Sequence, residues 1–277
     1  MRNINAYSEN CFEFHLNQVK RKQFKANDPA YKSRLDTLSP RIDLSYQEYT
    51  RLISEGSFEL IPKSDFSSQE KKDLLSLYRY DTKPIQDLHI LLTTINNRKF
   101  NTCQMCSIDP IGSFDHIVPK EEFPEFSVNP FNLFPCCLSC NQTKGKRWLE
   151  KDRRLFYNLY YDTLPDIEFL KINFNSYPIP EFSIDKTAIP SEFYRLTLSH
   201  YTKLNLFQRF KESSHEVIDS LVSSANAIIP MIGIEEYRKT VKKSSDEMRA
   251  LYGHNHWKSL LQVAIVNHEG FENLLVT

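Results

Sequence analysis

The sequence has no excess of charge of either sign and no long hydrophobic run. Thirty-five basic residues balance thirty-five acidic ones among 277 residues. The chain therefore has no overall field that attracts nucleic acid, and any such contact has to come from a local patch. No window approaches the roughly 18 uninterrupted apolar residues that a membrane span needs. Because the first residues also lack the apolar run of a signal peptide, we expect a cytoplasmic protein without a membrane segment.

Cysteine is scarce outside one short stretch. Five of the six cysteines lie within residues 103–140, and Cys11 lies apart from them. This distribution differs from the even spread of a disulfide framework, and in a cytoplasmic chain such clustering favours metal binding. A hydrophobic content of 40% with 13% aromatic residues is ample for a packed core. We therefore expect a globular protein whose chemistry lies in this stretch.

The clustered cysteines form two pairs with the spacing of metal knuckles. Cys103 and Cys106 make one C-x-x-C, and Cys137 and Cys140 make another. Two such pairs complete the closed tetrahedral sulfur site that structural zinc prefers. Cys136 is an alternative to Cys137, although only Cys137 has the two-residue spacing to Cys140. The separation between the pairs exceeds the usual zinc-ribbon spacer of about 15 to 20 residues, so a further segment is inserted between the knuckles.

The inserted segment and its borders carry a second group of polar residues. Asp115 and His116 are expected near the end of a short strand, Asn132 lies in PFNLF, and Asn141 follows the second cysteine pair near the start of a helix. Carboxylate and carboxamide oxygens suit Mg²⁺, which takes its remaining ligands from water and phosphate. A neutral histidine can deprotonate water at physiological pH. The pattern therefore predicts a site for phosphodiester hydrolysis.

These residues carry a family resemblance. The motifs CQMC, DHIVPK and NPFNLFPCCLSCNQTKG resemble those of the HNH endonucleases, which share the ββα-metal fold. The resemblance covers about residues 100–148. It implies that His116 is the general base and that Asp115 and Asn141 hold a catalytic Mg²⁺ or Mn²⁺. It further implies that Asn132 orients the histidine, and that the paired cysteines are zinc knuckles holding a structural Zn²⁺.

A basic segment directly follows the second cysteine pair. From its side chains we expect Lys144, Lys146 and Arg147 to contact nucleic-acid phosphates without reading sequence, although charge runs more commonly form a solvated helix face. The form DHIVPKEEFPEFSVNPFNLFPCC is also similar to HNH proteins kept by bacteria in anti-phage defence loci, often beside an ATPase. This similarity implies a role in defence and an ATPase partner.

Three other functions compete with cleavage of DNA. The same site suits RNA, for example a transfer RNA, and a non-catalytic zinc ribbon binds nucleic acid or protein without cleaving it. A zinc deaminase is excluded because its H-x-E motif is absent after His116.

The tripeptide His254, Asn255 and His256 spells H-N-H, but adjacent residues cannot share one face of a helix or strand. We expect it to cap a helix at the surface.

The predicted fold is α+β and mostly helical, with a central zinc-stapled ββα-metal HNH unit. We expect a helical N-terminal region over 1–99, the HNH nuclease unit over 100–150, and a mainly helical C-terminal region with a short β-hairpin over 151–277. Individual helices are predicted at 68–80, capped by Ser67 or Ser68, and at 148–162, 191–226, 234–251 and 255–266. The hairpin strands are expected within 167–175 and 180–185.

Overall fold

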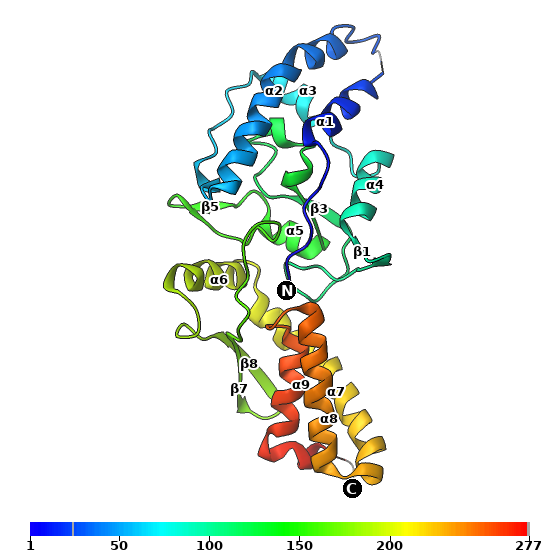
Figure 1. The fold of residues 1–277 in the computed structure, drawn as a ribbon, viewed down its shortest axis with the longest axis vertical. Coiled ribbons are helices and arrows are strands. Elements are labelled where there is room, and N and C mark those ends of the chain that lie inside the picture. Colours follow the sequence, from blue (N-terminus) through cyan, green and yellow to red (C-terminus); the bar gives the residue numbers. More distant parts are fainter. Residues whose placement is uncertain (24, 276–277) are drawn as a thin grey trace. The chain divides into compact units, whose positions relative to one another are not determined.

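The computed structural model describes residues 1–23 and 25–275, and the chain divides into two compact units (Figure 1). The N-terminal unit comprises Asn3–Cys103 and Asp109–Thr163. The C-terminal unit comprises Met1–Arg2, Gln104–Ile108 and Leu164–Thr277. Helices with small two-stranded sheets occur in the described parts of both, which confirms the α+β class. The two units divide the chain differently from the three regions expected from the sequence.

Helices form the first part of the N-terminal unit, as predicted. They are α1 (Cys11–Lys20), α2 (Tyr31–Ser54), α3 (Ser68–Leu75) and α4 (Lys83–Leu92), followed by the short hairpin of β1 (Thr94–Ile95) and β2 (Arg98–Lys99). Ser67 caps α3 through a capping box with Glu70, an arrangement that satisfies two backbone N–H groups at the helix start. The predicted helix at 68–80 therefore starts at its expected cap and ends earlier.

The long helix α2 buries one face against α1, α3 and the loop that follows β3. Its buried side chains recur every three or four residues, as one helix face requires: Tyr31, Leu35, Leu38, Ile42, Tyr46, Tyr49, Leu52 and Ile53. The rings of Tyr46 and Tyr49 pack against Phe126, with centroids 6.0 and 4.6 Å apart. Burying side chains of this size contributes about 1.5–3 kcal/mol each. The helical region, residues 11–92, and the motif segment, residues 100–148, thus share one core.

The motif segment forms a strand, a strand and a helix. β3 (Ser113–His116) pairs antiparallel with β4 (Leu133–Cys136), so that His116 lies opposite Leu133. The 3₁₀ turns η2 (Pro124–Phe126) and η3 (Pro130–Asn132) lie between these strands, and α5 (Leu138–Lys144) follows them. This order matches the predicted ββα arrangement, although the helix begins three residues before Asn141.

Residues 148–162 form a hairpin and an irregular segment, so the amphipathic helix predicted there is wrong. β5 (Leu149–Glu150) pairs with β6 (Arg153–Arg154). Between them Lys151 and Asp152 have φ of 50° and 57°, which fits the left-handed turn of a two-residue hairpin and not a right-handed helix. The apolar residues whose spacing suggested a helix are nevertheless buried: Leu155, Phe156, Leu159 and Tyr160.

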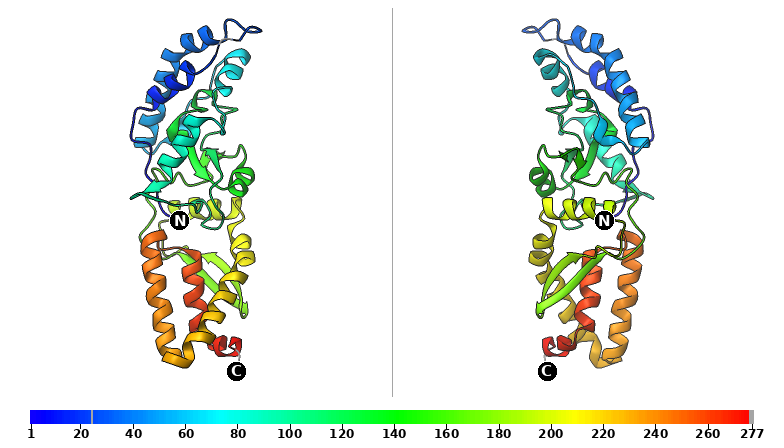
Figure 2. Two further views of the ribbon diagram at one scale, coloured as in Figure 1. Left: turned by 90° about the vertical axis from the view of Figure 1, so that its right-hand side faces the viewer. Right: turned by 90° about the vertical axis from the view of Figure 1, so that its left-hand side faces the viewer.

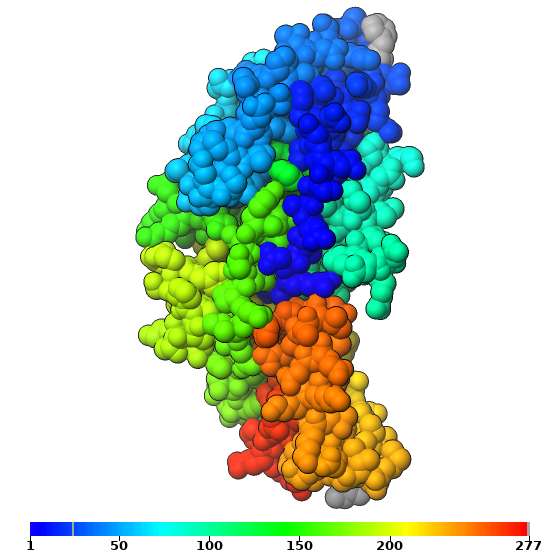
Figure 3. Space-filling model, viewed as in Figure 1, coloured from blue at the N-terminus to red at the C-terminus, as the bar shows by residue number. Residues whose placement is uncertain are grey.

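The extended start of the N-terminal unit lies against this irregular segment (Figure 3). Ile4 N donates a hydrogen bond of 3.1 Å to Leu159 O. Asn3 Nδ2 lies 3.0 Å from the same oxygen and 2.6 Å from Asp162 O. In turn, Tyr160 Oη donates to Leu133 O at 2.6 Å. Residues 3 and 4 therefore hold the irregular segment in place, and Tyr160 of that segment binds the first residue of β4.

The C-terminal unit consists of a hairpin and a set of helices. β7 (Leu170–Ser176) and β8 (Ile179–Ile184) pair antiparallel, which confirms the predicted hairpin. The helices are α6 (Ser191–Lys203), α7 (Leu206–Ile232), α8 (Ile234–Tyr252) and α9 (Trp257–Asn267), followed by the 3₁₀ segment η4 (Glu269–Leu274). α7, α8 and α9 run side by side (Figure 2), and the indole of Trp257 stacks on Phe210 between them at 5.1 Å.

The helix predicted over 191–226 is interrupted. Asn205 has a φ of 55°, a left-handed conformation that Asn tolerates better than most residues, and it separates α6 from α7. The helices predicted at 234–251 and 255–266 agree with α8 and α9 to within two residues. Within residues 1–23 and 25–275, none of the helices combines the length and the apolar character of a membrane span.

Candidate active site and metal centre

Four buried cysteines converge as the sequence predicts. The sulfur atoms of Cys103, Cys106, Cys137 and Cys140 all lie within 4.8 Å of one another. A zinc ion with Zn–S bonds of about 2.3 Å brings its four sulfur atoms about 3.8 Å apart, so these residues can hold zinc with little movement. The backbone N–H groups of Ile108 and Cys140 donate to the sulfur atoms of Cys106 and Cys137, at 3.4 and 3.3 Å. Such donors favour thiolates, which are the form that binds zinc.

Cys136 does not belong to this cluster. It lies on β4, and its sulfur is 3.4 Å from Ser113 Oγ. Burial raises the pKa of the Cys136 thiol far above its usual range, so the group stays protonated. Between the two alternatives left by the sequence, the structure places Cys137 in the cluster, where it also caps the N-terminus of α5.

A separate pocket of about 460 Å³ lies over β3 and the start of α5. Its walls include Asp115, His116 and Asn141, together with Tyr78, Lys120 and Lys146. The structure thus brings three of the four predicted catalytic residues to one opening. Asn132 is buried and does not line this pocket.

The imidazole of His116 has a defined tautomer. Nε2 lies 2.9 Å from the carbonyl oxygen of Ser127, and a carbonyl can only accept, so Nε2 carries the hydrogen. Nδ1 makes no hydrogen bond with the described residues and is left with its lone pair. Burial lowers the pKa of His116 to about 3, which keeps the ring neutral at pH 7. The Ser127 side chain in turn donates to Leu74 O of α3 at 2.9 Å, which anchors the accepting residue.

The carboxylate of Asp115 is buried and ion-paired. Lys144 Nζ lies 3.0 Å from Asp115 Oδ1 and 2.8 Å from His116 O. Burial raises the pKa of Asp115, and the neighbouring ammonium opposes that rise. The second oxygen, Oδ2, accepts no hydrogen bond from the described residues. Asp115 therefore presents one fixed and one available oxygen.

Asn141 presents its amide oxygen in a similar way. Its Nδ2 donates to Phe114 O at 3.1 Å and to Ser113 Oγ at 3.3 Å. These contacts set the orientation of the amide, and Oδ1 has no hydrogen-bond partner among residues 1–23 and 25–275. Two oxygen ligands from different elements, β3 and α5, are thus available at one pocket. This is a donor set that suits Mg²⁺ or Mn²⁺.

Asn132 acts on the loop and not directly on the histidine ring. Its Oδ1 accepts from Val118 N at 2.8 Å and from Tyr49 Oη at 3.3 Å, and its Nδ2 donates to Val118 O and Phe126 O at 3.0 and 3.2 Å. The resemblance implies that this residue orients the histidine. In the structure it holds the loop that carries Ser127, whose carbonyl contacts the ring.

The three basic residues expected at phosphates have different surroundings. Lys144 is only 2% exposed and is bound to Asp115, which does not match an exposed phosphate contact. Arg147 donates to the carbonyl groups of Thr143 and Lys144 at the end of α5, where a cation is favoured. Lys146 is exposed and lines the pocket.

The sequence reasoning did not identify Lys120 and Tyr78 as pocket residues. Lys120 stands within the DHIVPK motif, four residues after His116, and its position there was the available signal. Tyr78 comes from the segment between α3 and α4, and nothing in the local sequence indicated it. Its ring meets His116 edge to face, with centroids 4.6 Å apart.

The H-N-H tripeptide belongs to the C-terminal unit. His256 is the N-cap residue of α9, as expected, but Asn255 and His256 are buried and not at the surface. Asn255 Oδ1 accepts from Phe169 N and Leu170 N at 2.7 and 2.8 Å. These contacts anchor the start of β7, which is a structural role.

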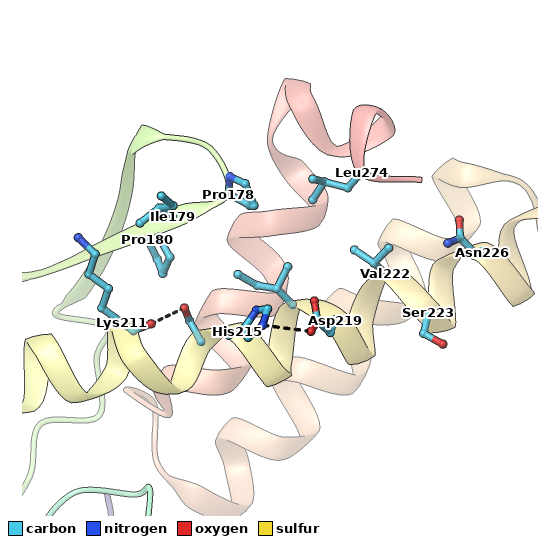
Figure 4. Close-up of a pocket in the computed structure, with 12 residues that line it drawn as sticks. Pro178, Ile179, Pro180, Lys211, His215, Asp219, Val222, Ser223, Asn226 and Leu274 are labelled. Atoms are coloured by element: carbon cyan, nitrogen blue, oxygen red, sulfur yellow. Dashed lines mark hydrogen bonds and ion pairs between the residues drawn. The ribbon is translucent and has the colours of Figure 1, made fainter. Parts of the chain in front are cut away.

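A larger hollow of about 780 Å³ lies in the C-terminal unit beside α7 and the β7–β8 turn (Figure 4). Its charged side chains are already engaged: Lys211 with Glu181, and His215 with Asp219 at 3.6 Å. The remaining lining is largely apolar, with Pro178, Ile179, Ile218, Val222 and Leu274. No group of metal-ligating side chains lies there among the described residues.

Comparison with known proteins agrees with the geometry of the motif segment. A family model described as HNH endonuclease matches residues 103–147. The chain is also 24% identical over 190 residues to Protein ea31 of Escherichia phage lambda. That alignment covers 61% of this chain and 62% of the phage protein, so the chain spans less than two thirds of its length. No solved structure matches. Residues 103–147 of this chain are an HNH endonuclease domain.

Proposed function

We propose that the chain is a metal-dependent endonuclease that hydrolyses phosphodiester bonds in DNA. One observation carries the proposal. Asp115 Oδ2, Asn141 Oδ1 and His116 Nδ1 have no hydrogen-bond partner among the described residues, although all three side chains line one pocket. A metal-ligand pair beside a neutral base is what hydrolysis of a phosphodiester requires.

The two proposed metal sites, at Asp115 with Asn141 and at the four cysteines, have different roles. Asp115 and Asn141 would hold Mg²⁺ or Mn²⁺, with water and substrate phosphate completing the shell. When bound, such a cation stabilises the charge that develops on the leaving 3′ oxygen. The four cysteines would supply all four ligands of a zinc ion, so zinc there would have a structural role.

His116 would activate the attacking water. Nδ1 accepts a proton from water while the water oxygen bonds to phosphorus and the P–O3′ bond breaks. The Nε2–H bond to Ser127 O keeps the ring in the tautomer that this step needs. Lys146, exposed at the pocket, would contact a phosphate, and Arg147 would add charge at the end of α5.

Cleavage of supercoiled plasmid DNA tests the proposal. We expect cleavage that depends on added Mg²⁺ or Mn²⁺. We expect His116→Ala to lower the rate by about 10²–10⁴-fold, the usual contribution of general acid–base catalysis. Zinc content should stay unchanged and the protein should stay folded, with a melting temperature lowered by the loss of the buried hydrogen bond to Ser127 O. His215→Ala, at a histidine that is 82% exposed, is the matched control and should cleave normally. Full activity of His116→Ala would exclude the assigned mechanism.

The same experiment separates the alternative functions. Cleavage of transfer RNA with intact plasmid would indicate an RNA substrate. Tight binding of nucleic acid without cleavage in either metal would indicate a non-catalytic zinc-ribbon module.

For the cellular role we propose anti-phage defence in the bacterial cytoplasm, together with an ATPase partner. The support is the similarity of the loop DHIVPKEEFPEFSVNPFNLFPCC to HNH proteins of defence loci. Cells that carry the gene with its chromosomal neighbours should form fewer phage plaques than cells carrying the His116→Ala form. Equal plaque numbers would argue against this role and leave the nuclease activity untouched.

A further inference from the structure

Tyr78 connects the helical region to the catalytic pocket. It lies between α3 and α4, outside residues 103–147 that match the family model. Its ring lines the pocket and stands edge to face on the imidazole of His116, at 4.6 Å between centroids and 76° between planes. This packing restricts rotation of the imidazole on one side, while the hydrogen bond to Ser127 O fixes it on the other.

Lys120 lies over the same tyrosine. Its Nζ is 4.5 Å from the ring centroid of Tyr78, within the range of a cation–π contact. The side chain is half-buried in the pocket wall. The neighbouring Glu121 also lines the pocket, yet no carboxylate among the described residues comes within ion-pair distance of Lys120. All three of its N–H donors are therefore available to an anion.

The other cations near the pocket are less available to bind an anion beside Tyr78. Lys144 is committed to Asp115, and Arg147 donates to backbone carbonyls of α5. Lys146 is exposed and follows α5. Lys120 and His116 both contact the ring of Tyr78, with Lys120 Nζ 4.5 Å from its centroid and the imidazole centroid 4.6 Å from it, and all three residues line the pocket. An anion bound by Lys120 would thus lie beside the proposed base.

We propose that Lys120, held over the ring of Tyr78, binds a phosphate of the nucleic-acid substrate next to His116. Tyr78 is the positioning residue that holds both Lys120 and the imidazole. This inference rests on the proposed nuclease function and names a phosphate-binding residue that it did not include. It also gives the helical region a direct role in the active site.

Binding measured without added Mg²⁺ or Mn²⁺ tests Lys120 apart from catalysis. Zinc-loaded protein is titrated into a labelled 20-base-pair DNA duplex, by fluorescence anisotropy, at several salt concentrations. Each phosphate contact contributes about 0.9 to the slope of log Kd against log salt concentration. We expect Lys120→Gln to lower that slope by about one contact and to weaken binding about tenfold. Lys32→Gln, at an exposed lysine of α2, is the matched control and should leave both unchanged.

Two variants of Tyr78 test the positioning role. Tyr78→Phe keeps the ring and should preserve both the salt slope and the cleavage rate. Tyr78→Leu removes the ring and should lower the slope as Lys120→Gln does, and it should also lower kcat. A purely structural role would lower the melting temperature of Tyr78→Leu but leave the salt slope unchanged.

The outcomes separate the two proposals. An unchanged slope and affinity in Lys120→Gln, in a protein whose wild type binds and cleaves, would overturn this inference alone. A slope that is unchanged in Tyr78→Leu would overturn the role of the tyrosine. Wild-type protein that neither binds nor cleaves DNA or RNA would overturn the proposed function together with this inference.

Discussion

Lys144 Nζ bridges Oδ1 of Asp115 and the main-chain oxygen of His116, at 3.0 and 2.8 Å, and both paired side chains are buried. Lys144 is the last residue of α5 and Asp115 lies on β3, so this ion pair joins the helix to the strand that carries the proposed base. It also occupies one carboxylate oxygen and leaves Oδ2 open to the proposed cation. The contact makes Lys144 part of the support for the proposed metal ligand.

Replacing Lys144 with methionine should destabilise the protein. The substitution leaves a buried carboxylate unpaired, which typically costs about 3–5 kcal/mol of unfolding free energy. Lys146→Met, at an exposed neighbour, should change that free energy by less than about 0.5 kcal/mol. Urea denaturation of zinc-loaded protein measures both.

A double variant sharpens this prediction. Asp115→Asn combined with Lys144→Met removes both charges and should recover part of the stability lost in Lys144→Met, because no buried charge then stays unpaired. Wild-type stability in the single Lys144→Met variant would contradict the importance of the pair.

The adjacent cysteines should differ in zinc binding. Wild-type protein should contain one zinc ion per chain, and Cys136→Ala should retain it because Cys136 lies outside the sulfur cluster. Cys137→Ser should lose zinc and with it much of the stability of the N-terminal unit. Elemental analysis with thermal melting measures both effects. Loss of zinc from Cys136→Ala and not from Cys137→Ser would assign the fourth ligand to Cys136.

Features of the site that depend on local spacing could be predicted from the sequence. The two C-x-x-C pairs predicted the sulfur cluster, and the residues around Asp115 predicted the strand that ends at His116. The β7–β8 hairpin was also predictable, because alternating apolar residues flank a Pro-containing turn. In each case the structure follows from residues that are close in sequence, where turn and strand preferences act directly.

Features that depend on tertiary packing could not be predicted in this way. Lys144 belongs to a basic run, which usually indicates exposure, yet the nearby carboxylate of Asp115 makes its burial favourable. The apolar residues of 155–160 have helical spacing, but the positive φ of Lys151 and Asp152 turns the chain into a hairpin. Tyr78 reaches the pocket only because α3 packs against the loop after β3.

Removing the side chain of Asn132 should destabilise the loop beneath the base. Asn132→Ala leaves Val118 N and Val118 O without this partner, whereas Phe126 O still accepts from Asn129 N at 3.2 Å. An unsatisfied buried polar group costs about 1–3 kcal/mol. We expect a total loss of about 2–4 kcal/mol and a lower kcat. Tyr49→Phe, which removes only the 3.3 Å bond to Asn132 Oδ1 and a second bond of 3.3 Å to Phe131 O, should lose less stability. Equal losses in the two variants would contradict this role of the amide.

His15 should make the protein less stable as the pH falls. The residue is fully buried, and neither ring nitrogen has a hydrogen-bond partner in the part of the chain that the structure describes. Burial lowers its pKa from 6.5 to about 4. Between these values the unfolded chain binds the proton and the folded chain does not, so this contribution to stability is present above pH 6.5 and is lost as the pH falls towards 4.

Replacing His15 with phenylalanine removes this titration and keeps an aromatic ring beside Phe12 and Tyr46. The free energy of unfolding of His15→Phe relative to wild type should be about 2 kcal/mol more favourable at pH 5 than at pH 8. Acid effects on the zinc cysteines act on both proteins and cancel in the difference. Denaturant titrations at the two pH values measure it. A difference that does not change with pH would show that His15 has the same pKa in the folded and the unfolded protein.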